Sequence, residues 1–309
     1  NSNLILLIFN NNLENFDFSN TKFDSTSEFT FDLSKKLKIK NLKIDSKVNL
    51  GELKLKYDFD KVKNYIKNYD NLIKLNKNKL NIKYSKNKLL IDGSSEFFIE
   101  DNSKNLLNFK IDKNLNKTNF NVNLNLNNIG LKINDIGLSK TKKDSATLQI
   151  KGSKNSKTIL FNNIIYTEDK NVIKISNLEI NNSKILNIDK IRAYYLTENN
   201  FKNDIALTKK DNNYELIGKS FDCIQLIENI SNSETGKSFF KIFKSLNTKI
   251  KVNIDEVKLD DANIVKNLNG NLEIRDSKIF NLNLDSDFTN NEKLFISIKT
   301  QKDGAVVTT

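Results

Sequence analysis

The chain has 309 residues, and its 50 Lys and Arg against 38 Asp and Glu give a formal net charge of +12. It contains no His, Pro, Met or Trp and a single Cys, which excludes His-based catalytic triads, His metal sites and an internal disulfide. Only Arg192 and Arg275 are arginines, and Arg is the side chain suited to bidentate contacts with bases and phosphates. The lysine excess therefore does not predict nucleic-acid binding.

Apolar and polar residues alternate from residue 29 onward. Successive side chains of a strand point to opposite faces, so this period predicts strands with one apolar and one polar face. The 20 Phe and 8 Tyr oppose disorder, since disordered segments are poor in aromatic residues. The first strand segments are residues 29–33, 37–44, 48–50 and 53–59.

The spacing changes at Asp60. Apolar residues then recur every three or four positions as far as Leu75, and Asp60 is suited to cap a helix, so the pattern predicts one helix over residues 60–75. Its other side carries Lys61, Lys63 and Lys67. Such a basic amphipathic helix can lie on an anionic membrane or can pack against a sheet, and both alternatives stay open.

Strand patterns resume at residue 80 and continue to residue 217, with a hairpin turn predicted at Asp92-Gly93 and a further turn at Asp135-Ile136-Gly137. Between Ser220 and Leu246 the spacing becomes helical again and predicts a pair of short helices. Alternation then returns and continues towards Thr309. Because consecutive strands usually pair with their neighbours, the sequence predicts a mainly β fold built as a long antiparallel sheet.

No reactive centre is predicted. Asp255-Glu256 and Asp260-Asp261 are adjacent carboxylates, but neighbours on a strand face opposite ways, so we interpret them as solvated residues and expect no enzyme activity, cofactor or metal. Cys223 is expected to pack as a small apolar residue. Function is instead expected in an extended apolar surface. Its candidate lining residues are Ile250, Val252, Ile254, Leu268, Leu272, Ile274, Leu282 and Leu284.

One stretch of sequence resembles a known family. Gly218-Lys219-Ser220-Phe221-Asp222 is followed by Leu226-Ile227, a helical link, alternating strands and Lys302-Asp303-Gly304-Ala305. This order is similar to that of the AsmA-like envelope proteins, in which a glycine, apolar residue and aspartate precede a helical pair and a series of strands. The chain departs from the family pattern by lacking a proline after the aspartate and by having few glycines.

The resemblance implies a curved, taco-like sheet, a repeating β-groove with an apolar concave face. It divides the chain into a groove segment, 1–217, and a module, 218–309, continuous with it. It further implies a periplasmic location in a protein anchored to the inner membrane outside this segment, and phospholipid transport to the outer membrane. We expect the chain to be an internal part of a longer protein.

A second hypothesis is a scaffold or biogenesis factor. Unpaired strand edges readily bind partner strands, so such a protein would bind outer-membrane assembly proteins through its edges. The two hypotheses make opposite predictions for charges placed on the apolar face.

Overall fold

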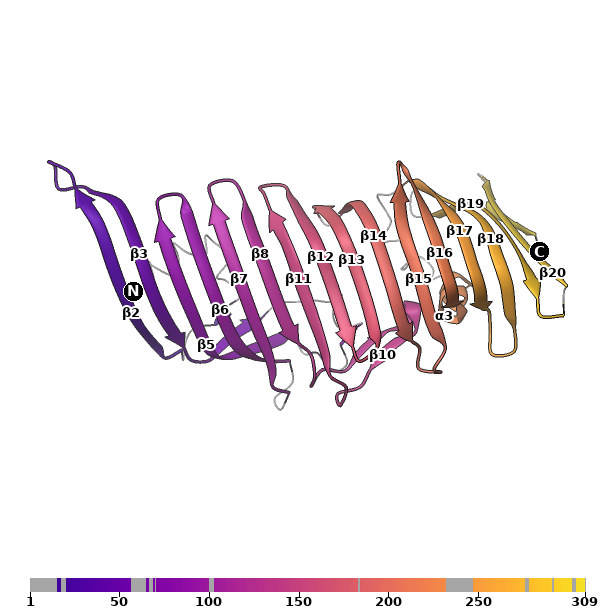
Figure 1. The fold of residues 1–309 in the computed structure, drawn as a ribbon, viewed down its shortest axis with the longest axis horizontal. Helices are drawn as coiled ribbons and strands as arrows, with labels where there is room; N and C mark the ends of the chain where they lie inside the picture. The colour runs from indigo at the N-terminus through magenta and orange to yellow at the C-terminus, as the bar shows by residue number, and fades with distance from the viewer. Residues whose placement is uncertain are drawn as a thin grey trace. The chain divides into compact units, whose positions relative to one another are not determined.

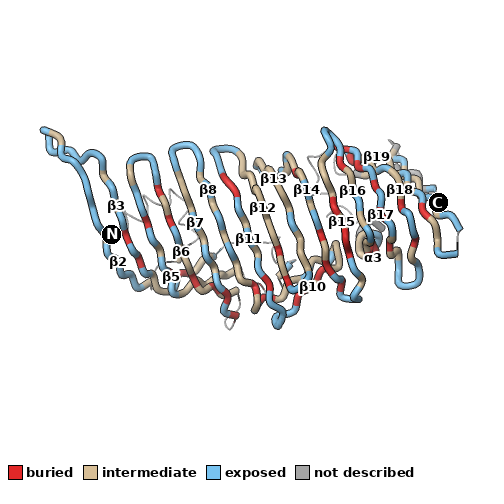
Figure 2. Tube along the Cα trace, in the orientation of Figure 1, coloured by how far each residue is buried: buried red, intermediate tan, exposed pale blue. Residues whose placement is uncertain are grey.

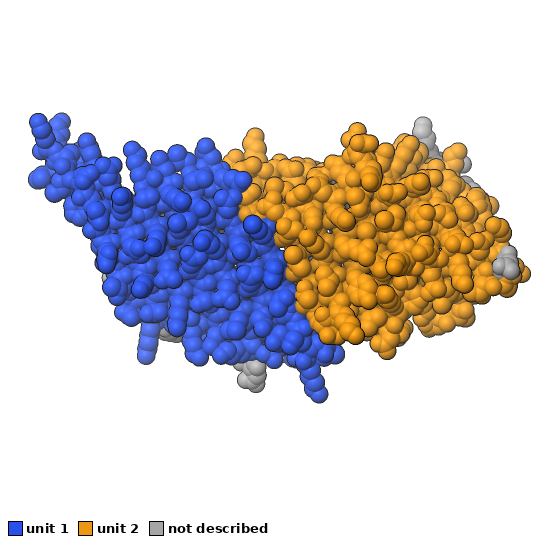
Figure 3. All heavy atoms as spheres, viewed as in Figure 1, with its two compact units in different colours: residues 1–131, 140–151 blue, residues 132–139, 152–309 orange. Residues whose placement is uncertain are grey.

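The fold is described from a computed structural model. The structure describes residues 16–17, 21–56, 65–66, 69, 71–99, 103–182, 184–231, 247–275, 278–290, 292–301 and 304–308. The chain forms two compact units, coloured separately in Figure 3: unit 1 comprises residues 1–131 and 140–151, and unit 2 comprises residues 132–139 and 152–309. As the sequence predicts, the fold is mainly β. Its strands form curved, predominantly antiparallel sheet structure that does not close into a barrel.

Unit 1 is a succession of strands in which most pair with the next along the chain (Figure 1). The exceptions are β3 with β5, β1 with β4 and β8 with β11, which pair although other strands lie between them in sequence. The strands are β1 (Phe16–Asp17), β2 (Phe23–Leu33), β3 (Ile39–Leu50), β4 (Leu53–Lys56), β5 (Leu72–Ser85), β6 (Lys88–Phe98), β7 (Asn105–Asn114), β8 (Thr118–Asn125) and the first part of β11 (Ala146–Lys154).

Unit 2 is also built from successive strands. They are β12 (Thr158–Glu168), β13 (Asn171–Asn181), β14 (Lys184–Leu196), β15 (Lys202–Lys210), β16 (Asn213–Asp222), β17 (Thr248–Lys258), β18 (Ile264–Arg275), β19 (Lys278–Phe288), β20 (Lys293–Gln301) and β21 (Gly304–Thr308). Two short strands, β9 (Leu131–Ile133) and β10 (Leu138–Lys140), pair around the 3-10 helix η1 (Asn134–Ile136). Gly137 ends η1 with φ +65°, in agreement with the turn predicted there.

One pair in unit 2 breaks the antiparallel rule. β16 and β17 are parallel, with Leu216 opposite Val252, because the chain crosses from the end of β16 back to the start of β17. A parallel pair needs such a crossover, which commonly contains a helix. The helix α3 (Ile224–Ser231) lies in this connection and confirms the first of the two predicted helices. The second falls outside the described residues.

The helix predicted over residues 60–75 is wrong at its carboxyl end. Leu72–Leu75 belongs to β5 and pairs with β4, while Ile66 forms an isolated bridge with Leu131. Short runs of apolar residues fit either period, and pairing with β4 satisfies the backbone groups here. Residues 60–64, 67, 68 and 70 lie outside the described part of the chain.

The hairpin turn predicted at Asp92-Gly93 is also wrong, because both residues lie within β6. Gly93 is opposite Phe109 of β7, and a Cβ at Gly93 would lie 2.2 Å from the Phe109 ring. The glycine is therefore required for the aromatic ring to cover the strand, not for a turn. The actual turn precedes it, between Ser85 and Lys88.

The division expected at residue 217 does not coincide with a boundary between the compact units, since β16 and β17 pair across it. Among the described residues no helix is long and apolar enough to cross a membrane. Burial alternates along the strands (Figure 2), most regularly in β17, where buried and exposed residues alternate from Thr248 to Asp255. One face of each unit thus collects the apolar side chains.

Candidate functional site

The strand register of unit 2 aligns one apolar residue from each of its neighbouring strands. Directly opposed residues lie on the same face of a sheet, so these residues form one line, which we term the apolar row and to which β18 contributes only the backbone of Gly270. Its members, from β12 to β20, are Ile164, Ile175, Ile191, Leu207, Leu216, Val252, Gly270, Leu284 and Ile296. At about 4.8 Å between strands, a row across nine strands extends about 38 Å.

The eight candidate lining residues all lie on the face that carries the apolar row. Val252 and Leu284 belong to the row itself. The others lie beside it as cross-strand sets, Ile250 with Leu272 and Leu282, Ile254 with Leu268, and Ile274 opposite Thr248. The register therefore places the eight candidates on one face of β17, β18 and β19, a point that the sequence alone leaves open.

The candidates differ in exposure, which separates two roles. Ile250, Val252, Ile254, Leu268 and Ile274 are buried, Ile254 and Ile274 at 2% and 1% exposure, and form a packed cluster with residues such as Tyr214 and Cys223. Leu272, Leu282 and Leu284 are half-buried. The buried residues stabilise the sheet, and the half-buried ones present apolar surface that a ligand can reach.

Most of the apolar row has the same intermediate exposure. Apart from Val252, each of its members is half-buried. The prediction of lining residues missed its members on β12 to β16 and on β20, although the period-two signal for them is present in the sequence. The missing information was the register, which decides which residue of each strand stands in line with Val252 and Leu284.

The opposite face of the same strands is polar. Lys251, Asn271 and Asn283 are directly opposed positions on β17, β18 and β19, and all three are exposed. On β14, Lys190 and Arg192 stand on either side of Ile191 and are exposed on this opposite face as well. The sheet of unit 2 therefore separates an apolar surface from a charged and hydrated one.

Unit 1 has a smaller surface of the same kind. Val48, Leu80, Gly93, Phe109 and Val122 stand opposite one another on β3, β5, β6, β7 and β8. Val48 is buried within a cluster that includes Leu80 and Phe109. Each unit thus carries an apolar line at right angles to its strands.

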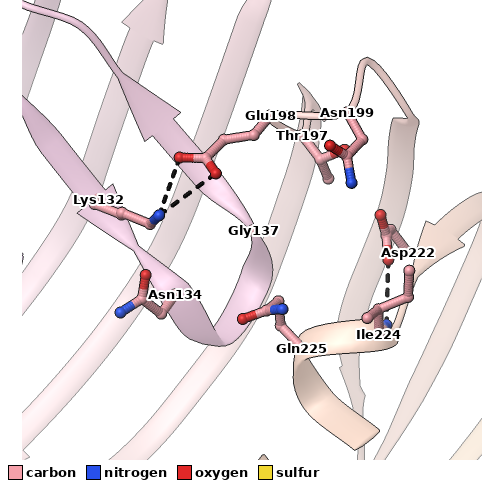
Figure 4. A pocket seen from close by; sticks show the side chains of 9 residues that line it. All are labelled: Lys132, Asn134, Gly137, Thr197, Glu198, Asn199, Asp222, Ile224 and Gln225. Atoms are coloured by element: carbon pink, nitrogen blue, oxygen red, sulfur yellow. Dashed lines mark hydrogen bonds and ion pairs between the residues drawn. The ribbon is translucent and has the colours of Figure 1, made fainter. Parts of the chain in front are cut away.

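A polar pocket of about 130 Å³ lies elsewhere in unit 2 (Figure 4). Lys132 forms an ion pair of 3.2 Å with Glu198 on one side. On the other, the carboxylate of Asp222 accepts a hydrogen bond of 3.1 Å from the backbone N–H of Ile224, at the start of α3. Hydrogen bonds from Ser139 and Lys132 hold the pKa of Glu198 below its ordinary value. These contacts account for the charged groups of the pocket as caps and ion pairs.

The carboxylate pairs singled out in the sequence are placed at a strand and a turn. Asp255 is exposed on β17. Asp260 accepts hydrogen bonds of 2.8 Å from the backbone N–H groups of Ala262 and Asn263, and Asp261 pairs with Lys258 at 2.9 Å. No group of three or more potential metal ligands occurs within the described ranges.

Comparison with known proteins gives no relative: no family model matches the chain, and no curated protein or solved structure is significantly similar to it.

Proposed function

We propose that the chain is a non-enzymatic segment of a phospholipid conduit, in which acyl tails lie along the apolar face of the sheet while head groups stay in water. On the basis of the sequence resemblance alone, we propose the periplasm as the location, between an inner membrane that holds the rest of the protein and the outer membrane. No side chain performs chemistry in this proposal. The protein supplies a surface only.

The observation that carries the proposal is the apolar row, which crosses nine strands and whose members, apart from Val252, are half-buried. A fully packed core would bury these side chains, as it does Ile254 and Ile274. Contiguous apolar surface that stays accessible is uncommon in soluble proteins and marks binding sites. Because the row crosses the strands at right angles, it extends as far as strands are added to the sheet.

The energetics favour a lipid as the occupant. Transfer of an acyl tail of about sixteen carbons from a bilayer to water costs on the order of 12 kcal/mol, at about 0.8 kcal/mol for each methylene. An uninterrupted apolar line removes most of that cost along its length. An interrupted one would leave part of the tail in water.

Two adjacent residues of β16 provide a matched test. Leu216 belongs to the apolar row, whereas Ile217 lies on the opposite face and is 44% exposed. We expect protein purified in mild detergent to retain phospholipid by mass spectrometry, Leu216→Asp to retain at least about tenfold less, and Ile217→Asp to retain the normal amount.

Circular dichroism checks that both variants fold. If Leu216→Asp does not, Leu284→Asp with its neighbour Asn283→Asp as control repeats the comparison on β19. Absence of lipid from the unaltered protein, or equal retention by both variants of a pair, would contradict the proposal.

The alternative scaffold function is favoured by one feature, the strand β2. Ten of its 11 residues pair with β3 along one edge, and it presents Phe23 and Phe29 at 52% and 53% exposure. A scaffold that binds through this edge would lose its partner when proline replaces Thr26 and would tolerate Leu216→Asp. The conduit predicts the reverse.

A further inference from the structure

The turn between β2 and β3 carries an unusual combination of side chains. Leu33, Leu37 and Ile39 are 58%, 79% and 58% exposed, so this hairpin tip holds three of the most exposed apolar residues in the described chain. Lys35, Lys36, Lys38 and Lys40 alternate with them and are also exposed. Apolar side chains surrounded by lysines are the composition that binds anionic membrane surfaces.

The tip is an ordered structure. The backbone N–H of Leu37 donates to the carbonyl oxygen of Ser34 at 2.8 Å, and that of Ser34 donates to the carbonyl oxygen of Lys38 at 3.0 Å. The one nearby carboxylate, Asp32, accepts a hydrogen bond of 2.7 Å from the side chain of Asn41. The hydrogen bonds therefore fix a turn whose lysines and apolar residues are exposed.

Leu37, at the tip, has an unusual backbone conformation for a leucine. Leu37 has φ +54°, a conformation that costs a bulky residue free energy and that Asn, Asp or Gly adopts readily. In the described part of the chain, the other non-glycine residues at positive φ are Asn or Asp, with Lys77 as the one exception. A leucine at this position is unfavourable for the fold, which indicates a use for its side chain.

Neighbouring turns of unit 1 add to the charge. β3 pairs with β5 from Ile44 and Tyr84 onward, so the β2–β3 hairpin continues past the end of β5. The β5–β6 and β7–β8 turns lie at this same end of the sheet, since Lys88 is opposite Ser85 and Asn114. These turns contribute Lys86, Lys88 and Lys117, together with Leu115 at 73% exposure, and residues 34–38, 85–88 and 114–118 contain no Asp or Glu.

We propose that the β2–β3 hairpin tip docks on an anionic bilayer, with Leu33, Leu37 and Ile39 inserted at the interface and the surrounding lysines against phosphate head groups. Aliphatic side chains favour this occupant over a nucleic acid, which would call for aromatic residues or arginines. The inference stands apart from the proposed conduit. Its surface lies in unit 1 and does not include the apolar row.

The decisive variant is Leu37→Asn. Asn tolerates positive φ, so the thermal unfolding temperature should stay equal or rise, whereas flotation with vesicles of phosphatidylcholine and phosphatidylglycerol should fall at least about tenfold. The change would thus separate membrane binding from stability. Equal flotation of Leu37→Asn and the unaltered protein would overturn the proposal.

A matched pair of triple variants tests the lysines. Replacement of Lys35, Lys36 and Lys38 by Ser should weaken partitioning about fivefold for each lysine. Replacement of Lys47, Lys79 and Lys110 by Ser, on the strands of the same unit, removes the same charge and should have little effect. Specific docking would be contradicted if both triple variants lost the same amount of vesicle binding. It would also be contradicted if the unaltered protein floated equally well with vesicles of phosphatidylcholine alone as with anionic vesicles.

The absence of Trp from the sequence gives a direct optical readout. The fluorescence of Leu37→Trp should shift to shorter wavelength when anionic vesicles are added, and that of Leu106→Trp, at an exposed position of β7 away from these turns, should not. The contrary result would be that the protein is retained on DNA, that this retention is lost when Lys35, Lys36 and Lys38 are replaced, and that vesicles cause no shift in fluorescence. It would identify nucleic acid as the partner and overturn the inference.

Discussion

Cys223 illustrates how a single residue is assigned by its surroundings. The thiol lies in the main cluster of unit 2, where its Sγ donates to the carbonyl oxygen of Lys258 at 3.2 Å. Burial, with a smaller contribution from the charge of Asp222, raises the pKa of this thiol to about 12. Nucleophilic cysteines have lowered pKa values instead, so Cys223 packs as an apolar residue, as the sequence predicts.

This shift predicts a loss of stability at alkaline pH. Below about pH 8.5 both the folded and the unfolded chain keep the thiol protonated; above it the unfolded chain ionises while the folded chain does not until about pH 12. The free energy of unfolding should therefore fall as pH rises across that range. Urea unfolding of Cys223→Ala should show a weaker fall. An equal pH dependence of the two proteins would show that Cys223 is not buried as described.

Burial also raises the pKa of Tyr195, whose hydroxyl donates to the carbonyl oxygen of Ile136 at 2.8 Å. Tyr195 acts in the same direction as Cys223, so part of the alkaline loss should persist in Cys223→Ala. The contribution of the thiol is the difference between the two proteins.

Among the elements, β18 and β19 depend on the approach of their backbones at Gly270. Gly270 has φ +152°, and a Cβ there would lie 2.0 Å from the carbonyl oxygen of Asn283, an atom held within the strand pair. Gly270→Ala should lower the free energy of unfolding by about 3 kcal/mol, from backbone strain and overpacking together. Gly130→Ala is the control, since its Cβ would meet no atom closer than 3.8 Å. Similar unfolding midpoints for the two variants would show that β19 can move away.

Most strands were predictable from the sequence because one face of each strand is apolar and the other is polar. Which face of β17 to β19 packs against the rest of the unit did not follow, because alternation separates two faces without saying which of them is covered. The crossover between β16 and β17 was predictable only as a helical interruption, because nothing in the spacing of Phe221 or Leu226 distinguishes a parallel return from an antiparallel one.

The errors arise where partners distant in sequence decide the local structure. Leu72–Leu75 fits a helix by itself and becomes a strand because β4 pairs with it. Asp92-Gly93 fits a turn by itself and lies in a strand because Phe109 covers the glycine. The apolar row could not be predicted as a row, since it is defined by the register between strands, which single-strand patterns do not contain.

At the scale of the whole molecule, both proposals depend on surfaces of the described residues. Unit 2 offers the apolar row, and unit 1 offers a basic and apolar turn. The proposals assign a lipid tail to the first and a lipid head-group layer to the second. Each can fail without the other, because the residues that carry them lie on different units.

The most direct measurement is photo-crosslinking from single positions of the sheet in the presence of phospholipid vesicles. A photoreactive residue placed in turn at Leu207, Leu216 and Leu284, all in the apolar row, should yield protein–phospholipid adducts by mass spectrometry, and one placed at Ile217 or Asn253 on the opposite face should not. Adducts from both faces in equal amount, or from neither, would contradict a lipid path along this sheet.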